Sequence, residues 1–410
     1  MKKDFSNKSN GEVFPPFFTP WRLKWYPRAL LFALAVGFFI TIFFGRHAST
    51  LTGKLGGDYP AFFSAGRIIA EGDWKNLYNS NKQAKVQEEL YPGEEKVFMP
   101  FPYPPYVAVA YYPLSLLPYR MSYVIHTLVM VAAIFLTVIL LCPINKQIRQ
   151  NYFFIACIVL SFYPMFRAVL GGQNTAITLF LFVLSWRAVL AKKELLAGLI
   201  LGMLLFKPQF GLPLIGLYVL SGRWLVGVGS LFTAMILYEI GVLISGPTWI
   251  TDWYQYTIWL SRADAGINFD KAVSWLGFFQ AILGWENRLA LFIGCAMSGV
   301  TAIFVALTWL IGRSRADLTA QLGITAVALV LIPPHVNYYD ISLVLFTCLA
   351  MFGMTVKKPW VPLGFLWIFG FSQPLSNLLG FSPLFLVLIS AMTVSIYFLG
   401  KPAIQNVYAD

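Results

Sequence analysis

Asp58 is the residue of this sequence with the clearest chemical potential. It follows the pair Gly56-Gly57 and stands shortly after the first long apolar stretch. A carboxylate so close to lipid is costly unless it faces water or a bundle interior, so we interpret it as functional. It could take a proton from a hydroxyl group. Alternatively, Asp58 caps the helix expected over Tyr59–Ala70, because Asp readily accepts a hydrogen bond from an amide at a helix start. The two roles are compatible.

Basic and amide side chains elsewhere could hold an anion or a sugar beside such a base. Lys207 separates two apolar stretches. It could bind an anionic ligand such as a phosphate, or its ammonium group could extend to the membrane interface. Gln173 and Asn174 follow Gly171-Gly172 and open an expected helix. They could cap this helix or bind anions and hydroxyls at its N-terminus.

His335 follows two prolines and precedes a Tyr-Tyr-Asp sequence that ends at Asp340. This fixed, polar and aromatic setting favours a functional role over an incidental loop histidine. Asp340 could simply cap the next helix. His126 lies inside an apolar stretch, and we interpret it as a hydrogen-bonded residue of the helix bundle.

Two arginines and two tyrosines complete the candidate set. Arg67 and Arg167 are either phosphate ligands or partners for Asp58. Tyr103 and Tyr339 carry rings that suit stacking on a sugar. One carboxylate, a few cations and many aromatic rings fit glycosyl transfer from a lipid-phosphate sugar, in which the cations stabilise the departing phosphate. A transporter or a flippase of lipids or lipid-linked sugars is the alternative.

Metal or cofactor chemistry is not indicated. The sequence has no metal-binding, nucleotide-binding or serine-hydrolase motif in a plausible context. The four cysteines lie in or beside apolar stretches without paired spacing, so we expect neither disulfides nor zinc and interpret them as buried thiols. We therefore predict no metal and no cofactor.

The composition is that of a membrane protein. Of 410 residues, 58% are hydrophobic and only 12% are charged, with a mean hydropathy of +0.68. A soluble domain carries about 25% charged residues. The net charge of +12 could suggest nucleic acid as a partner, but the basic residues sit at the ends of apolar stretches rather than in one patch. Membrane lipids, and not nucleic acid, are therefore the expected partners.

We predict an all-α integral membrane bundle of about 12 transmembrane or re-entrant helices. The expected domains are a cytoplasmic segment 1–28, one membrane domain 29–400 and a cytoplasmic tail 401–410. Within the membrane domain, residues 46–104 form a large external loop with helices over 58–71 and 81–90, and residues 246–285 form a second external segment. The short stretch 106–117 could re-enter, and the hairpin around residue 207 is expected to turn inside the protein. The expected crossings are 29–45, 121–141, 152–168, 174–190, 195–206, 208–220, 224–243, 289–311, 318–332, 341–354, 360–371 and 384–399.

The distribution of Lys and Arg predicts the orientation. Basic residues mark every second boundary between apolar stretches, which places both termini in the cytoplasm. Every polar cluster named above then lies on the external face. A transporter would instead carry polar groups in mid-span, often with an inverted repeat. We expect a multi-pass protein of the bacterial cytoplasmic membrane with its active site on the external, periplasmic face.

At these residues the sequence resembles glycosyltransferase family 87, whose members have the GT-C membrane fold. The resemblance covers roughly residues 28–375 and rests on short motifs in a fixed order: Gly57-Asp58-Tyr59, Ala65-Gly66-Arg67, Phe101-Pro-Tyr-Pro-Pro105, Gly172-Gln-Asn174, Lys207-Pro208 and His335-Val-Asn-Tyr-Tyr-Asp340.

The resemblance implies a mechanism and its substrates. Asp58 would be the general base, and His335, Lys207 and Gln173 would match polar positions near the active site. The donor would be a polyprenyl-phosphate sugar, with mannose or another hexose transferred to a hydroxyl of a lipid or glycan acceptor by inverting, metal-independent displacement. The first external loop would form the lid that is typical of the fold.

Overall fold

The computed structural model describes residues 20–44, 56–90, 98–311, 318–351 and 360–399. These residues form helices and no β-strand, which confirms the expected all-helical class. Most of the expected N-terminal segment 1–28, the whole tail 401–410 and parts of the first loop lie outside the described residues.

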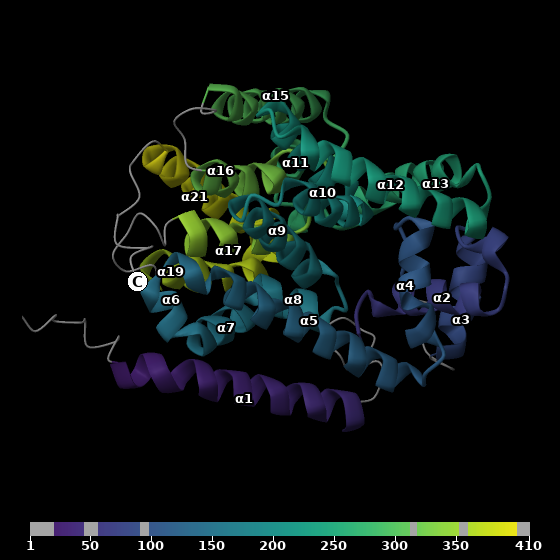
Figure 1. Cartoon of the computed structure of the whole chain (residues 1–410). Helices are drawn as coiled ribbons and strands as arrows, with labels where there is room; N and C mark the ends of the chain where they lie inside the picture. The colour runs from purple at the N-terminus through teal and green to yellow at the C-terminus, as the bar shows by residue number, and fades with distance from the viewer. Residues whose placement is uncertain (1–19, 45–55, 91–97, 312–317, 352–359, 400–410) are drawn as a thin grey trace, which may run out of the picture.

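Long apolar helices give the molecule its frame (Figure 1). Within the described residues, three helices are long and apolar enough to cross a membrane: Tyr119–Ile144, Trp224–Ser245 and Arg288–Ile311. They correspond to α5 (Tyr119–Leu141) with the short turn that follows it, α12 (Trp224–Ser245) and α15 (Arg288–Ile311). Seven further apolar helices have only 10–17 residues. The expected count of about twelve crossings is therefore not confirmed.

The expected crossing over residues 152–168 consists of two helices with a sharp bend between them rather than one continuous helix. Helix α7 (Tyr152–Ser161) and helix α8 (Tyr163–Leu170) are bent by 72° at the break between them. Pro164 lies in the first turn of α8 and has no amide proton to donate to the turn before it, so the helix restarts there. The bend gives α8 a direction of its own.

Helices without a polar face fill the core. Helix α16 (Leu318–Leu331) is buried along nearly its whole length, as expected for a helix that is apolar on all sides. Beside it lie α9 (Thr175–Leu190) and the helical segment 338–351, where the ring of Phe346 packs 5.3 Å from that of Trp186. The segment consists of η7 (Tyr338–Leu343), α17 (Val344–Phe346) and η8 (Thr347–Met351).

Helices α10 (Glu194–Met203) and α12 approach each other closely through glycines. A Cβ on Gly198 would overlap the backbone of α12, and a Cβ on Gly229 would overlap that of α10. Small residues at such crossings let apolar helices pack tightly. Between α10 and α11 (Pro208–Leu220) the chain turns at Lys207, which is buried, as expected for a hairpin that turns inside the protein.

The described part of the first loop, together with the residues that follow it, forms a helical lobe at one side of the molecule (Figure 1). Its helices are α2 (Tyr59–Ala70), α3 (Ser80–Leu90) and α4 (Pro105–Ser115), which confirms both expected loop helices and the short third one. Gly66 on α2 touches α4 so closely that a Cβ there would lie 2.7 Å from the carbonyl oxygen of Tyr111. Any larger residue would separate the two helices.

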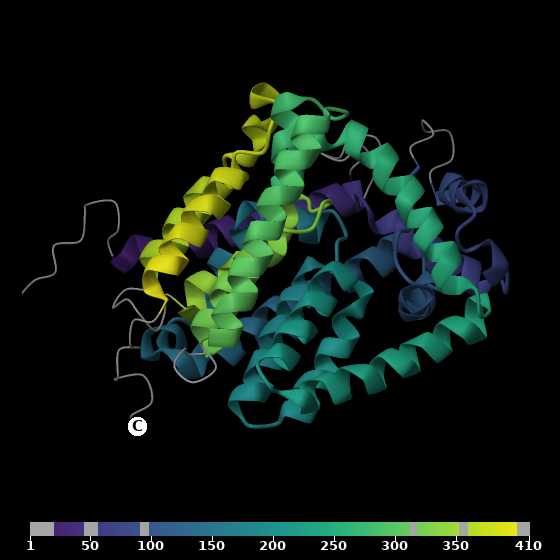
Figure 2. The same ribbon diagram turned by 90° about the horizontal axis from the view of Figure 1, so that it is seen from above.

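The second segment, 246–285, is mostly helical as well. Helix α13 (Trp249–Ile267) starts at the end of α12 and runs back at an angle to it (Figure 2); η5 (Phe269–Lys271) and α14 (Trp275–Leu283) follow. Trp253 donates a hydrogen bond to the carbonyl of Pro102 at 3.0 Å, and the Tyr256 hydroxyl lies 3.3 Å from the Gln83 side-chain oxygen. Helix α13 therefore docks on the first loop.

The remaining described helices connect or cover the elements named so far. They are α1 (Pro20–Phe44), η2 (Trp74–Asn76), η3 (Cys142–Ile144), α6 (Lys146–Gln150), η4 (Leu204–Phe206), α19 (Trp360–Gly370), η9 (Gln373–Leu375), α20 (Ser376–Leu379) and α21 (Leu384–Phe398). All four cysteines are free, and Cys295 on α15 is exposed rather than buried as expected, because its face of the helix has no protein neighbour to cover it.

Candidate active site

Two glycine turns from distant parts of the chain meet at Asp58. Gly57 has φ +57° and Gly172 has φ +66°, conformations that favour glycine. A Cβ on Gly57 would lie 2.9 Å from the Cα of Gly171, and one on Gly172 would overlap Tyr59. The amide of Asp58 donates a hydrogen bond to the carbonyl of Gly171 at 2.9 Å. The two turns therefore fix the start of α2 against the start of α9.

The Asp58 side chain does not act as a helix cap. Asp58 occupies the N-cap position of α2, yet its carboxylate makes no capping hydrogen bond. Instead the Gln173 side-chain nitrogen donates a hydrogen bond to Asp58 Oδ2. The alternative in which Asp58 serves only as a cap is therefore wrong. A partly exposed carboxylate with an amide partner can still accept a proton from a ligand.

Tyr103 extends this hydrogen-bonded group. Its hydroxyl donates to the Gln173 side-chain oxygen at 3.4 Å. Burial, followed by the negative charges of Asp340 and Asp58, raises the pKa of Tyr103 well above its ordinary value, so the hydroxyl stays protonated. Asn174 lies next to Tyr103, and its buried Oδ1 has no hydrogen-bond partner within the described residues. Like Asp58, Asn174 precedes a helix without capping it.

Lys207 forms a buried ion pair with Asp340. The ammonium nitrogen lies 2.9 Å from Asp340 Oδ1, and only 5% and 8% of the two side chains are exposed. The possibility that Lys207 extends to the membrane interface is therefore wrong. Asp340 is not a cap either, because Asn337 holds the N-cap position of η7 and Asp340 lies inside that helix. Its role is to neutralise Lys207.

Tyr339 and Arg167 also belong to the group of residues around Asp58. Electrostatic interactions link the Tyr339 hydroxyl to Asp340, Asp58 and Tyr103. Arg167 on α8 donates a long hydrogen bond of 3.5 Å to the hydroxyl of Tyr338 and interacts electrostatically with Asp58. The first loop, α8, the start of α9 and η7 therefore all contribute polar groups to one site around Asp58.

Comparison with known proteins identifies the family. The family model for glycosyltransferase family 87 matches residues 101–334, more than half of the chain. The chain belongs to glycosyltransferase family 87. It is a membrane glycosyltransferase, and the transporter alternative loses its support. No curated protein sequence matches the chain.

The residues matched by the family model include only part of the site of this glycosyltransferase. Tyr103, Gln173, Asn174 and Lys207 lie inside the matched residues, whereas Asp58 precedes them. Contacts across the boundary, above all the hydrogen bond from Gln173 to Asp58, join the two parts. His335 follows the match by one residue.

His335 lies on an exposed loop between α16 and η7. Both of its neighbours are fixed by residues of the segment 246–285. The carbonyl of Val336 accepts a hydrogen bond from the amide of Val273 at 3.0 Å, and the carbonyl of Pro334 accepts one from the Ser274 hydroxyl at 3.2 Å. The loop that carries His335 is therefore anchored on residues just before α14.

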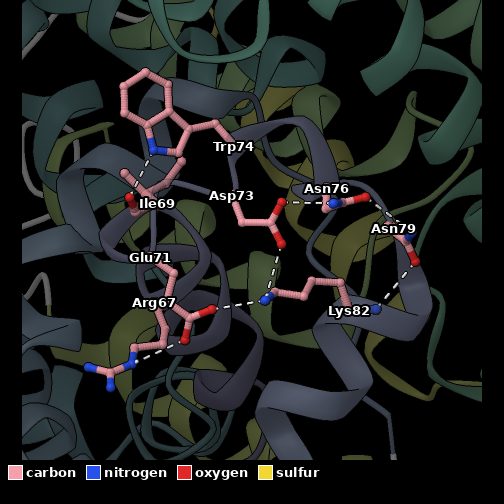
Figure 3. Close-up of polar contacts among 8 residues, drawn as sticks. All are labelled: Arg67, Ile69, Glu71, Asp73, Trp74, Asn76, Asn79 and Lys82. Atoms are coloured by element: carbon pink, nitrogen blue, oxygen red, sulfur yellow. Dashed lines mark hydrogen bonds and ion pairs between the residues drawn. The ribbon is translucent and has the colours of Figure 1, made fainter.

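Arg67 does not join the site. It lies nine residues after Asp58 on α2, which corresponds to about 14 Å along the helix axis. Its guanidinium lies 3.6 Å from the carboxylate of Glu71, and Glu71 also pairs with Lys82 at 2.9 Å (Figure 3). Lys82 in turn reaches Asp73 at 3.1 Å. This network is exposed and ties α2 to α3.

His126 is a buried, hydrogen-bonded residue of the bundle, as expected, but the sequence did not predict that it lies next to the site. Its Nδ1 lies 3.2 Å from the Tyr111 hydroxyl, its ring is 4.8 Å from that of Tyr59, and it interacts with the backbone of Gly172 and Gln173. It therefore supports the turn that carries Gln173. The available signal was a histidine in the middle of an apolar stretch, where polar residues are expensive.

The acidic and metal-binding side chains are dispersed. Within the described ranges, no three His, Cys, Asp or Glu side chains are grouped closely enough to hold a metal ion. The chemistry that the site can supply itself is proton transfer by Asp58, hydrogen bonding by its amides and tyrosines, and charge stabilisation by its cations.

Proposed function

We propose that this glycosyltransferase moves a sugar, mannose or another hexose, from a polyprenyl-phosphate sugar to a hydroxyl of a lipid or glycan acceptor. The observation that carries the proposal is the Asp58 carboxylate, which is partly exposed, not used as a cap and oriented by Gln173. A family 87 enzyme needs a base for the acceptor hydroxyl, and Asp58 is the carboxylate around which the site is built.

The reaction is a single inverting displacement. The acceptor oxygen attacks the anomeric carbon and forms the new glycosidic bond, while the bond from that carbon to the phosphate oxygen breaks. The acceptor proton passes to Asp58, and the polyprenyl phosphate leaves with the bonding electrons. Asp58 takes this proton in its carboxylate form, as a general base does.

The other residues bind and orient the donor in this proposal. The unpaired Asn174 Oδ1 can accept a hydrogen bond from a sugar hydroxyl, because a buried acceptor without a partner is costly until a ligand satisfies it. Tyr103 and Tyr339 contact the sugar ring. Lys207 contributes positive charge toward the phosphate and His335 a ring nitrogen for hydrogen bonding, although Lys207 binds the phosphate directly only when its ion pair with Asp340 opens.

We further propose that the reaction takes place at the external face of a bacterial cytoplasmic membrane, with both chain termini in the cytoplasm. The positive-inside distribution of Lys and Arg supports this orientation. No cofactor enters the mechanism, since the lipid-linked sugar is already activated.

The test supplies radiolabelled polyprenyl-phosphate mannose to membranes that contain wild type, Asp58→Asn or the control Asp252→Asn. Asp252 is an exposed carboxylate on α13. We expect wild type and the control to label lipid or glycan products, and Asp58→Asn to lose at least about 100-fold in rate, as general-base removal does. Equal transfer by Asp58→Asn would overturn the base assignment, and no transfer by wild type from a panel of lipid-linked sugars would overturn the donor class.

A further inference from the structure

Arg167 is a cation of the site that carries no ion pair within the residues that the structure describes. Its hydrogen bond to the hydroxyl of Tyr338 is long, at 3.5 Å. The side chain is half-buried and interacts electrostatically with Asp58. Lys207, in contrast, is already neutralised by Asp340 at 2.9 Å. Arg167 therefore has the charge that is available for an anionic ligand.

Aromatic rings connect Arg167 to the outer helices of the bundle. Tyr163 lies one helical turn before Arg167, so both side chains lie on one face of α8. The Tyr163 ring is stacked near that of Tyr338, with centroids 6.4 Å apart, and is 5.8 Å from the ring of Phe371. Phe371 follows the last residue of α19. The rings of Tyr163 and Phe371 thus connect Arg167 to the end of α19.

An apolar groove begins at this end of α19. It runs between α19 and α21, and the segment 344–348 forms its floor. Its volume is about 640 Å³, within the range of ligand pockets. Ser372 and Phe369 lie at the end next to Phe371. Its lining side chains are almost all apolar and include Phe365, Leu366, Leu386, Val387, Ala391 and Val394.

We propose that Arg167 binds the phosphate of the lipid donor and that the groove between α19 and α21 holds the isoprenoid chain attached to it. This inference rests on the proposed function. An amphiphile with one phosphate at the end of a long hydrocarbon chain needs a cation at the end of an apolar groove, and Arg167 and the groove provide this pair. The Arg guanidinium matches a phosphate with two parallel hydrogen bonds.

A phosphate bound by Arg167 would also be well placed for the reaction at Asp58. In an inverting displacement the base and the leaving group lie on opposite sides of the reacting carbon. A phosphate on Arg167 and an acceptor hydroxyl on Asp58 would place the anomeric carbon between two side chains whose charges already interact. The positive charge stabilises the phosphate as its bond to the sugar breaks.

The experiment measures donor binding and transfer with the full-length protein in lipid vesicles. Two donors carry the same sugar phosphate, one on a long polyprenyl chain and one on a two-isoprene chain. The variants are Arg167→Gln, Arg167→Lys and Ala391→Trp, which fills the groove, and the control is Val300→Trp on the exposed face of α15. Thermal unfolding checks that each variant folds. Binding of polyprenyl phosphate without sugar is measured in parallel.

We expect Arg167→Gln to raise KM and Kd about ten-fold or more for both chain lengths, with partial rescue in Arg167→Lys. Ala391→Trp should raise the values about ten-fold for the long chain only, and Val300→Trp for neither. Unchanged binding in Arg167→Gln, or an equal effect of Ala391→Trp on both chains, would refute the inference. If wild type binds polyprenyl phosphate with the expected dependence but transfers no sugar, the proposed function fails and the binding site stands.

Discussion

Gln173 donates a hydrogen bond to Asp58 across 115 residues of sequence. The bond exists because two glycine turns, at Gly57 and Gly172, bring the starts of α2 and α9 into contact. It turns the carboxylate away from the capping position that its place in the helix would suggest. A donor that holds one carboxylate oxygen fixes the direction in which the side chain points, which is the arrangement a positioned base requires.

Replacing this donor with a carboxylate should impair the enzyme more than removing it. In Gln173→Glu two carboxylates lie side by side, and their repulsion favours a shared proton that blocks Asp58 as a base. We expect transfer at neutral pH to fall about 100-fold in Gln173→Glu and about ten-fold in Gln173→Leu. Initial rates in vesicles measure both. Gln255→Glu, an exposed position on α13, is the control. Equal rates in wild type and Gln173→Glu would contradict the role of this hydrogen bond.

Gly172 should tolerate no side chain. Its φ of +66° strains other residues, and a Cβ there would lie 2.8 Å from the carbonyl oxygen of Gly56 and overlap Tyr59. We expect Gly172→Ala to lose at least about 2 kcal/mol in the free energy of unfolding, together with activity. Gly216→Ala is the matched control, because a Cβ at this exposed helical position meets nothing within 4 Å. Similar unfolding temperatures of the two variants would show that the turn contact is unimportant.

Sequence patterns predicted the helices well and the contacts poorly. The helices of the first loop follow from apolar periodicity and polar boundaries, both local properties of the chain. The bend at Pro164 was missed because the residues around it are as apolar as those of a continuous crossing. The number of crossings could not be confirmed, since short apolar helices in a bundle have the same composition whether or not they cross a membrane.

For the site, too, the sequence predicted residue types better than contacts. Asp58, Gln173, Asn174 and Tyr103 were selected for their residue types, and the structure brings them together. The pairing of Lys207 with Asp340 could not be predicted, because the partners are 133 residues apart and no sequence pattern links them. Arg67 was selected for its charge, but its position at the far end of α2 separates it from Asp58.

The Lys207–Asp340 pair should be important for folding. Removing one partner leaves an unpaired charge in a buried environment, so Lys207→Met and Asp340→Leu should each lose about 3–5 kcal/mol of unfolding free energy. The double variant removes both charges and should recover most of this loss. Chemical unfolding of the four proteins in a double-mutant cycle measures the coupling. Additive losses would mean that the two residues do not interact energetically.

Tyr103 should make the stability sensitive to alkaline pH. Burial, with the nearby charges of Asp340 and Asp58, raises the pKa of Tyr103 in the folded protein, so the folded state keeps this proton at a pH where the unfolded chain has lost it. The unfolded state then binds fewer protons, and stability falls as pH rises above about 10. The unfolding free energy of wild type should therefore decrease more steeply with pH than that of Tyr103→Phe. We expect the two slopes to differ by up to about 1.4 kcal/mol per pH unit. Parallel curves from pH 9 to 11 would contradict this prediction.

Arg67→Gln should change donor binding little, unlike substitution of Arg167. Arg67 is exposed, pairs with Glu71 at 3.6 Å, and belongs to the network that continues through Lys82 to Asp73. Exposed ion pairs of this kind contribute about 0–1 kcal/mol, so the variant should fold normally. We expect its KM for the donor to stay within about three-fold of the wild-type value. A change of that size corresponds to less binding free energy than the 1.4 kcal/mol of a ten-fold change. Steady-state kinetics with the long-chain donor measures this. An increase of ten-fold or more would mean that α2 presents Arg67 to the phosphate, and that the first loop closes over the site by a movement that this structure does not contain.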